Sequence, residues 1–531
     1  MNVPSVMQHK FSEIPHADIP RSSFDRSHGY KTTFDAGYLV PIFLDEALPG
    51  DTFNLRMTAF GRLATPIHPF MDNMFANTFF FAVPIRLIWD NWQKFNGEQA
   101  NPADSTDFVV PTMTSTAVTG YTAGSLHDYF GLPTEIPDLE HMSLPHRAYN
   151  LIWNEWFRDQ NLQDSVVVDT DDGPDDPADY VLLRRGKRHD YFTSALPWPQ
   201  KGESVDLPLG TTAPIHGLGI DSNAAYAATG TTQRMNNPAT MSGLTLQEVG
   251  TGSGSRLWVE EDPDNSGWPN IYADLSDASA ATINQLRQAF QIQKLYERDA
   301  RGGTRYTEII RSHFGVTSPD ARLQRPEYLG GGQSPINIDP VAQTSSTDAT
   351  SPQGNLSGFG TVTASGHGFT KSFTEHCIII GLVSIRADLN YQQGLNRMWS
   401  RSTRWDFYWP ALAHIGEQAI LNKEIYAQGS LAATDDDVFG YQERFAEYRY
   451  KPSVITGQFR SNHATSLDTW HLAQDFSSLP VLNDAFIQDN PPVDRVVAVT
   501  SEPDMLWDSF FELRCARPMP LYGVPGLMDH F

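Results

Sequence analysis

Hydrophobic and polar residues alternate along parts of the chain with the period of two that marks a β-strand. In Thr52–Ala59 every second residue from Phe53 onward is apolar, which predicts a strand with one packed face and one wet face. Phe75–Leu87 is apolar on both faces and therefore indicates a central strand covered from both sides. Further strands are expected toward both ends of the chain, at Gly37–Leu44, Glu375–Arg386, Glu443–Tyr450, Val496–Thr500 and Phe510–Arg514.

The middle of the chain changes to a helical period. Apolar residues recur on one face of Pro145–Arg158, Asp277–Arg301 and Arg305–Phe314, and this spacing predicts helices. Glycines directly follow the second and third segments, and Thr304 is a candidate N-cap for the third. The pattern thus predicts an all-β-dominated frame into which several α-helices are inserted.

Other stretches divide the chain further. We expect an N-terminal arm over residues 1–30, a helical and acidic-loop insertion over 145–200 and a helical insertion over 277–315. Lys201–Asn270 is rich in small and polar residues, has little periodicity and is too long for an ordinary turn, so it is expected to form a separate surface insertion. Gly330–Gly366 is also rich in Gly, Ser and Thr, which is typical of an extended arm or a flexible linker.

Composition narrows the class of protein. The 39 Gly and 36 Pro are scattered along all 531 residues, which favours a loop-rich β architecture over a helical bundle. A formal net charge of −25 repels polyanions, so binding of free nucleic acid is not expected to be the main activity. With only two cysteines, no signal-peptide pattern at the N-terminus and no apolar run of bilayer length, we expect a protein of a reducing compartment such as the cytoplasm.

The common catalytic motifs are absent from the sequence. The chain has no nucleophile elbow, P-loop, zinc-protease helix or paired Cys-x-x-Cys spacing, and this favours a structural role over an enzyme. Two alternatives stay open. One is a glycan hydrolase on a β frame, because sequence does not reveal the distance between carboxylates. The other is a lectin-like binding module.

Two acidic stretches raise the question of a metal. Calcium prefers carboxylate oxygens, but the glycine within the stretch 169–179 is out of place for an EF-hand loop, so a solvated acidic loop is the simpler interpretation. Asp435–Asp437 poses the same question with less context. His376 beside Cys377 lacks a second ligand pair, and a packed thiol is expected. No cofactor is therefore expected, with a divalent cation such as calcium as the alternative.

A cluster of cationic and aromatic residues is the most informative local feature. It runs from Arg397 to Trp409, and sequence-tolerant binding of single-stranded nucleic acid uses such side chains to neutralise phosphates and to stack on bases. Arg and Trp also anchor protein interfaces, so a contact between subunits is the alternative. The candidate nucleic-acid residues are Arg397, Trp399, Arg401, Arg404 and Trp405. A second basic patch, near Tyr191 and Phe192, consists of Arg184, Arg185, Lys187 and Arg188.

Several unusual strings are spread over nearly the full length of the chain. They are FDRSHG at Phe24–Gly29, KTTFDAG at Lys31–Gly37, ALPWPQ at Ala195–Gln200, LYER at Leu295–Arg298, GGTRY at Gly302–Tyr306, FGYQE at Phe439–Glu443 and RCARPMP at Arg514–Pro520. In this order they resemble the major capsid proteins of gokushoviruses, a group of the microviruses.

The resemblance implies a single eight-stranded viral jelly roll spanning residues 1–531, with long inter-strand insertions that contain several α-helices. It also implies a T=1 icosahedral shell of sixty copies around a circular single-stranded DNA genome. A family insertion similar in position to Lys201–Asn270 builds a protrusion at each threefold axis, which implies attachment to a host surface receptor. Further implied partners are an internal scaffolding protein and a DNA pilot protein. Because a subunit with a charge of −25 does not neutralise an enclosed genome, we expect a contribution from counterions, a small basic DNA-binding protein or a lumen-facing basic strip at Arg397–Arg404. The expected location is the virion, after synthesis in the bacterial cytoplasm.

Overall fold

The computed structural model describes residues 20–203, 205, 215–216, 218–221, 256–259, 272–273, 283–303, 305–316, 324–349, 352–429 and 433–522. The chain divides into two compact units, of which the first comprises residues 1–199 and 318–531 and the second comprises 200–317. The predicted insertions at 201–270 and 277–315 therefore fall together in the second unit.

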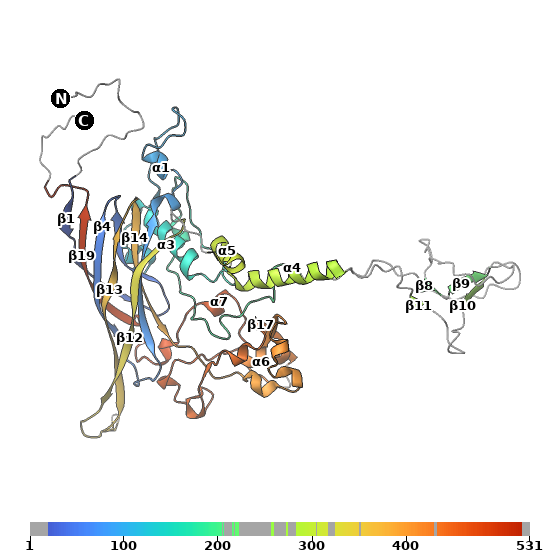
Figure 1. Cartoon of the computed structure of the whole chain (residues 1–531). Coiled ribbons are helices and arrows are strands. Elements are labelled where there is room, and N and C mark those ends of the chain that lie inside the picture. Colours follow the sequence, from blue (N-terminus) through green and yellow to red (C-terminus); the bar gives the residue numbers. More distant parts are fainter. Residues whose placement is uncertain are drawn as a thin grey trace. The chain divides into compact units, whose positions relative to one another are not determined.

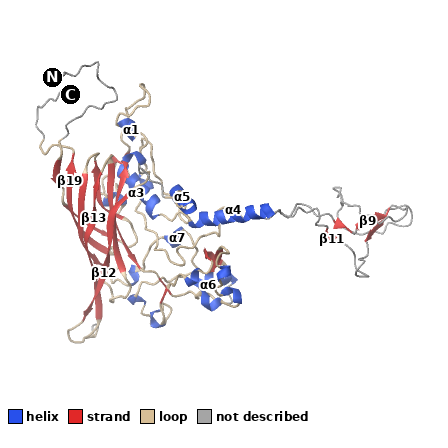
Figure 2. Cartoon of the chain, viewed as in Figure 1, coloured by secondary structure: helices blue, strands red, loops and turns tan. Residues whose placement is uncertain are grey.

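The first unit is built on a large antiparallel sheet that curls into a half-barrel (Figures 1 and 2). Its order is β1-β19-β4-β13-β12-β5-β14-β3, and β2 pairs with β19 beside β1. Since β1 and β2 follow one another along the same edge of β19, the sheet is eight strands wide. The strands are β1 (Ser22–Asp25), β2 (His28–Phe34), β3 (Val40–Ala47), β4 (Thr52–Leu63), β5 (Met74–Pro84), β12 (Glu327–Ala342), β13 (Leu356–Ser372), β14 (Cys377–Ala387) and β19 (Met505–Arg517).

Periodicity predicted the best-defined strands because each has a buried face. In β4, Phe53, Leu55 and Met57 are buried while the intervening residues are exposed, as the alternation predicted. Strands β5 and β14 are mostly apolar on both faces because they separate two cores: Phe80 packs in one, and Phe81 in the other. The prediction of a central, doubly covered strand is confirmed.

Strands β12 and β13 correct the interpretation of Gly330–Gly366 as a flexible arm or linker. Most of this segment lies in two long paired strands, and β12 pairs first with β5 and then with β13. Its glycines permit close approach of neighbouring backbones. A Cβ atom on Gly331 would lie 2.1 Å from the carbonyl oxygen of Thr78, and one on Gly330 would lie 2.4 Å from that of Gly368.

Three other predictions are wrong in detail. Glu443–Tyr450 is not a strand, because the chain turns at Phe445 with φ of 62° and continues as a 3-10 helix. Val496–Thr500 packs Val496 and Val497 into the core, leaves Val499 exposed and forms only an isolated bridge, between Pro66 and Val497. Within the expected N-terminal arm, residues 22–25 and 28–30 belong to β1 and β2; residues 1–19 lie outside the described part.

The predicted helices are confirmed with shifted ends. In the first unit, α3 (Leu144–Ile152) continues into a π-helical turn at Trp153–Phe157. The second unit contains α4 (Ile283–Arg301) and α5 (Tyr306–Phe314), which ends at left-handed Gly315; Thr304 lies outside the described residues. The short helices are α1 (Trp92–Phe95), α2 (Leu126–Tyr129), α6 (Asn422–Ile425) and α7 (Asp484–Ile487). None of the described helices combines the length and apolar character that crossing a bilayer requires.

The remaining strands are short and form two-stranded ladders. Parts of the interval Lys201–Asn270 that are described belong to such ladders, while most of that interval lies outside the described residues. These strands are β6 (Thr112–Thr114), β7 (Glu140–Met142), β8 (Ile215–His216), β9 (Leu218–Asp221), β10 (Arg256–Val259), β11 (Tyr272–Ala273), β15 (Asn390–Tyr391), β16 (Glu417–Leu421), β17 (Val438–Glu443) and β18 (Ser453–Val454).

Candidate functional site

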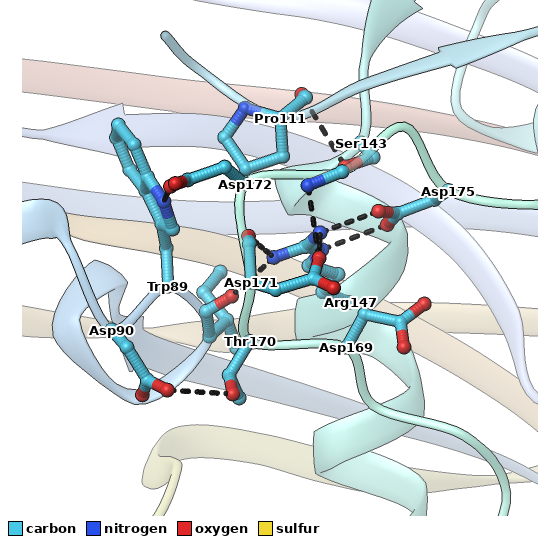
Figure 3. A network of polar contacts seen from close by, with 12 residues as sticks. Trp89, Asp90, Pro111, Ser143, Arg147, Asp169, Thr170, Asp171, Asp172 and Asp175 are labelled. Carbon is cyan, nitrogen blue, oxygen red and sulfur yellow. Dashed lines mark hydrogen bonds and ion pairs between the residues drawn. The ribbon is translucent and has the colours of Figure 1, made fainter. Parts of the chain in front are cut away.

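Arg147 on α3 is the centre of a buried polar network (Figure 3). Its guanidinium forms a bidentate ion pair with Asp175, in which Nε lies 2.7 Å from Oδ2 and Nη2 donates to Oδ1. Its Nη1 also donates to the backbone oxygens of Ile88, at 3.0 Å, and Asp171, at 2.8 Å. The exposed fraction of the side chain is 0% for Arg147 and 1% for Asp175. This network ties α3 to the acidic loop.

The acidic loop is therefore only partly solvated. Asp171 and Asp172 are exposed, although Asp172 also accepts hydrogen bonds from Trp89, at 2.7 Å, and Asn91. For Asp175 the solvated interpretation is wrong, because this carboxylate compensates the buried charge of Arg147. Burial opposes ionisation of Asp175, but hydrogen bonds from Arg147 and Tyr180 outweigh it and lower the pKa of the carboxyl.

The cationic and aromatic strip, residues 397–409, is held against the molecule by two of its arginines. Arg397 Nη1 lies 2.6 Å from the backbone oxygen of Ala419 and 2.8 Å from Oε1 of Glu424. Arg401 pairs with Glu447 at 3.6 Å, and its guanidinium lies 4.4 Å from the ring centre of Tyr448. Both glutamates have almost completely buried side chains. These two arginines are thus engaged within the chain.

The rings of the strip point toward solvent instead. Trp399 is 71% exposed and Trp405 is 57% exposed. Arg404 is exposed, and its guanidinium lies 5.3 Å from the ring centre of Trp405 and 4.5 Å from that of Trp409. Phe407 and Tyr408 add further exposed ring surface. Several large exposed apolar groups on one short segment are characteristic of an interaction surface.

The second basic patch is divided between different surroundings. Arg184 lies over Tyr38 and donates to backbone oxygens, while Tyr191 and Phe192 are buried in a separate core. Arg185, Lys187 and Arg188 line a cavity of about 430 Å³, which we call the basic cavity. Its aromatic walls were missed by sequence reasoning because they come from remote segments, namely Phe79, Phe81, Trp156, Phe157 and Tyr328.

The remaining candidate ligands have ordinary partners. Asp435 accepts backbone hydrogen bonds from Gln428 and Gly429, and Asp436 pairs with Lys423. Cys377 and Cys515 are both free thiols and both buried, which confirms the expectation for Cys377. Among the described residues, no group of three or more His, Cys, Asp or Glu side chains is arranged to hold a metal ion.

A curled sheet, together with a separate segment of short turns that exposes several aromatic rings, fits proteins that act by packing against other subunits, the class that includes viral coat proteins. The chain matches, over residues 12–527, the family described as "Capsid protein (F protein)", and it belongs to that family of phage capsid proteins. It is a structural protein of the virion shell and not an enzyme, and it assembles with copies of itself.

Three relatives are similar over nearly their whole length, and each is described as capsid protein VP1. The protein of Bdellovibrio phage phiMH2K is 52% identical over 99% of this chain and 98% of its own. That of Chlamydia phage 1 is 48% identical, with the same coverage, and that of Spiroplasma virus 4 is 36% identical over 98% of this chain and 97% of its own. These relatives confirm the resemblance to gokushovirus capsid proteins.

Proposed function

We propose that sixty copies of this chain close into a T=1 icosahedral shell around circular single-stranded DNA. The observation that carries the proposal is the end-to-end similarity to capsid proteins of three phages. A closed shell needs each subunit to present complementary surfaces to its neighbours, and equivalent copies related by symmetry meet that need.

We further propose that the sheet is an eight-stranded viral jelly roll. With β1 and β2 counted as one strand, the first strand pairs with the eighth, the second with the seventh, the third with the sixth and the fourth with the fifth. A long hairpin of four strand pairs wound around a core produces such nested pairing, which supports a jelly roll. The insertion between β5 and β12 carries α3, α4 and α5, in keeping with long helical insertions.

The cationic and aromatic strip is proposed as a contact between copies. Two arginines of the strip are already paired within the chain, Arg397 with Glu424 and Arg401 with Glu447. The exposed tryptophans are therefore the main groups of the strip that are available to contact another molecule. Desolvated tryptophans are frequent hot spots of protein interfaces. DNA binding is the second candidate role, and the exposure of Arg404 between two indole rings favours it for Arg404 and Trp405.

Other proposed roles follow from the family. We propose that the insertion 201–270 forms the threefold protrusion and binds a host surface receptor. Because each chain carries a formal net charge of −25, the shell does not neutralise its genome by itself, which supports cations or a small basic DNA-binding protein as packaging partners. An internal scaffolding protein and a DNA pilot protein are the further proposed partners.

Nuclease protection tests the proposal. Particles purified from infected or co-expressing cells are treated with nuclease, and the surviving DNA is sized and digested with a single-strand-specific enzyme. We expect protected, circular DNA that this enzyme degrades after the shells are opened. Recovery of closed shells whose protected DNA is double-stranded would refute the proposed content.

A further inference from the structure

The basic cavity lies in the first unit and combines two kinds of lining that differ from the rest of this acidic chain. Its cationic lining comprises Arg158, Arg185, Lys187, Arg188 and Arg386, against one carboxylate, Asp159. The cavity measures about 430 Å³, which lies within the size range of small-molecule sites. A concave site rich in positive charge, within a protein of net charge −25, selects an anionic ligand.

Several guanidinium groups around the cavity retain unused donors. Arg185 Nη1, Arg158 Nε and Arg386 Nε are buried and have no hydrogen-bond partner among the described residues. Arg386 also uses its Nη2 to donate to Gln333, at 3.0 Å. Buried donors without partners are unfavourable, so these guanidinium groups carry their charge without a full set of hydrogen bonds, which favours an anion in the adjoining cavity.

The electrostatic surroundings of Arg185 point the same way. Burial, assisted by repulsion from Arg386, lowers the pKa of Arg185 to about 10. Asp489 packs nearby and opposes this repulsion, and burial raises the pKa of its own carboxyl to about 6. One carboxylate thus faces four cationic side chains, Arg184, Arg185, Lys187 and Arg386. Arg188 pairs only distantly with Asp388, at 3.7 Å. An incoming phosphate would therefore relieve mutual repulsion within the cluster.

The opposite wall is aromatic and partly open. The Phe81 ring centre lies 5.4 Å from that of Trp156 and 5.5 Å from that of Tyr328. Trp156 Nε1 donates to the backbone oxygen of Pro326, which fixes the edge of the indole, while 39% of the residue stays exposed. Arg185 lies 5.0 Å from the ring centre of Phe79, so cations and rings adjoin one another. Flat rings next to phosphate-binding groups are the combination that holds a nucleotide.

We propose that the basic cavity binds one nucleotide unit, stacking its base on the Trp156 and Tyr328 wall and holding its phosphate with Arg185, Arg188 and Arg386. An anionic glycan is the less favoured ligand, because sugar hydroxyls need acceptors and the lining offers a single carboxylate. The bound nucleotide belongs to packaged single-stranded DNA, and this part of the inference rests on the proposed function. A free nucleotide shares the same chemistry.

Binding to the full-length, unassembled chain tests the site. Fluorescence and calorimetric titrations use dAMP, deoxyadenosine, deoxyribose 5-phosphate and a short oligodeoxyadenylate. We expect dAMP and the oligonucleotide to bind and to quench tryptophan emission, with deoxyadenosine and deoxyribose 5-phosphate each weaker by about tenfold or more. Equal binding of dAMP and deoxyribose 5-phosphate would overturn the stacking role, and equal binding of deoxyadenosine and dAMP would overturn the phosphate role.

Variants separate this cavity from general electrostatics. Arg185→Gln is expected to weaken dAMP binding by about tenfold, and Arg188→Ala, at a largely exposed side chain, by a smaller factor. The matched control is Lys31→Ala, which removes one charge from the exposed surface of β2 and is expected to leave binding unchanged. Thermal unfolding of each variant shows whether it is folded. Equal losses in Arg188→Ala and Lys31→Ala would refute a specific site.

The source of the nucleotide is tested in assembled particles by ultraviolet crosslinking and peptide mapping. Crosslinks of packaged DNA to peptides containing Trp156 or Tyr328 support a genome strand. If the free chain binds dAMP but no such crosslinks form in particles, the ligand is a free nucleotide, and the claim that the cavity binds the packaged strand is overturned. Particles without single-stranded DNA would defeat the proposed function while leaving dAMP binding intact, so the two failures are distinguishable.

Discussion

Replacing Arg147 with methionine is expected to be among the most destabilising single changes in the first unit. Arg147→Met keeps much of the side-chain volume but leaves the carboxylate of Asp175 buried without its partner. Removing one member of a buried ion pair typically lowers the free energy of unfolding by about 3–5 kcal/mol. The carbonyl oxygens of Ile88 and Asp171 also lose a donor, so the upper part of this range applies.

The double variant Arg147→Met/Asp175→Leu distinguishes the ion pair from simple packing. Apolar replacement of both partners removes the uncompensated charge, so the double variant should recover most of the loss, though not all, because two carbonyl oxygens stay without their donor. Urea unfolding of the full-length, unassembled chain measures these free energies, with Lys31→Ala as a surface control. A single variant within about 1 kcal/mol of the original chain, or a double variant no more stable than the single one, would refute this reasoning.

The same pair predicts a dependence on pH. Arg147 lowers the pKa of Asp175, so the stability that the pair supplies is present above the ordinary carboxyl pKa and is lost as the pH falls through the lowered value. In Arg147→Met the carboxyl of Asp175 protonates more readily. The difference between the original chain and the variant should therefore shrink toward acid pH, and a constant difference from pH 7 to pH 4 would count against the ion-pair account.

Other predictions concern assembly, titration and the sheet. Trp399→Ala should prevent or weaken shell formation without lowering the unfolding midpoint, as seen by sedimentation and thermal unfolding; a destabilised monomer would instead indicate a folding role. Burial raises the pKa of Asp504 to about 6, so stability falls as the pH rises from the ordinary carboxyl pKa through that value. Between pH 5 and pH 7 this loss of free energy of unfolding is about 1.4 kcal/mol, and Asp504→Asn should reduce it in urea unfolding at these two pH values. Gly331→Ala should lower the free energy of unfolding by about 1–3 kcal/mol, because the added Cβ atom would clash with the backbone of Thr78. Gly29→Ala, whose added Cβ atom would have its nearest neighbour at 3.7 Å, should be nearly neutral, and equal effects of the two changes would contradict this account.

Much of the sheet was predictable because burial on one face imposes a period of two. Thr52–Ala59 and Phe75–Leu87 were recognised for this reason, although the structure moves their ends. The glycine-rich strand β12 was not predicted, since its ladder depends on backbones approaching too closely for a Cβ atom. The close approach involves neighbours on β5 and β13, which are remote from β12 in sequence. The local composition of β12 by itself therefore suggested a linker.

The functional surfaces were predicted less completely than the fold. The aromatic rings of the cationic strip lie close in sequence, so their clustering was visible, but the partners of Arg397 and Arg401 come from other segments. Likewise the basic patch at 184–188 was visible, whereas the aromatic wall beside it is assembled from β5, the π-helical turn and β12. Asp175 illustrates the same limit, because only the position of Arg147 distinguishes it from the exposed aspartates around it.

The mass of intact particles tests the central claim most directly. Charge-detection mass spectrometry of DNA-free shells formed by the full-length chain should give a single species of about 3.6 MDa, which is sixty times the 59.3 kDa mass of the chain. Persistence of monomers and small oligomers under conditions that support assembly, or closed shells with a different copy number, would contradict the proposed T=1 capsid.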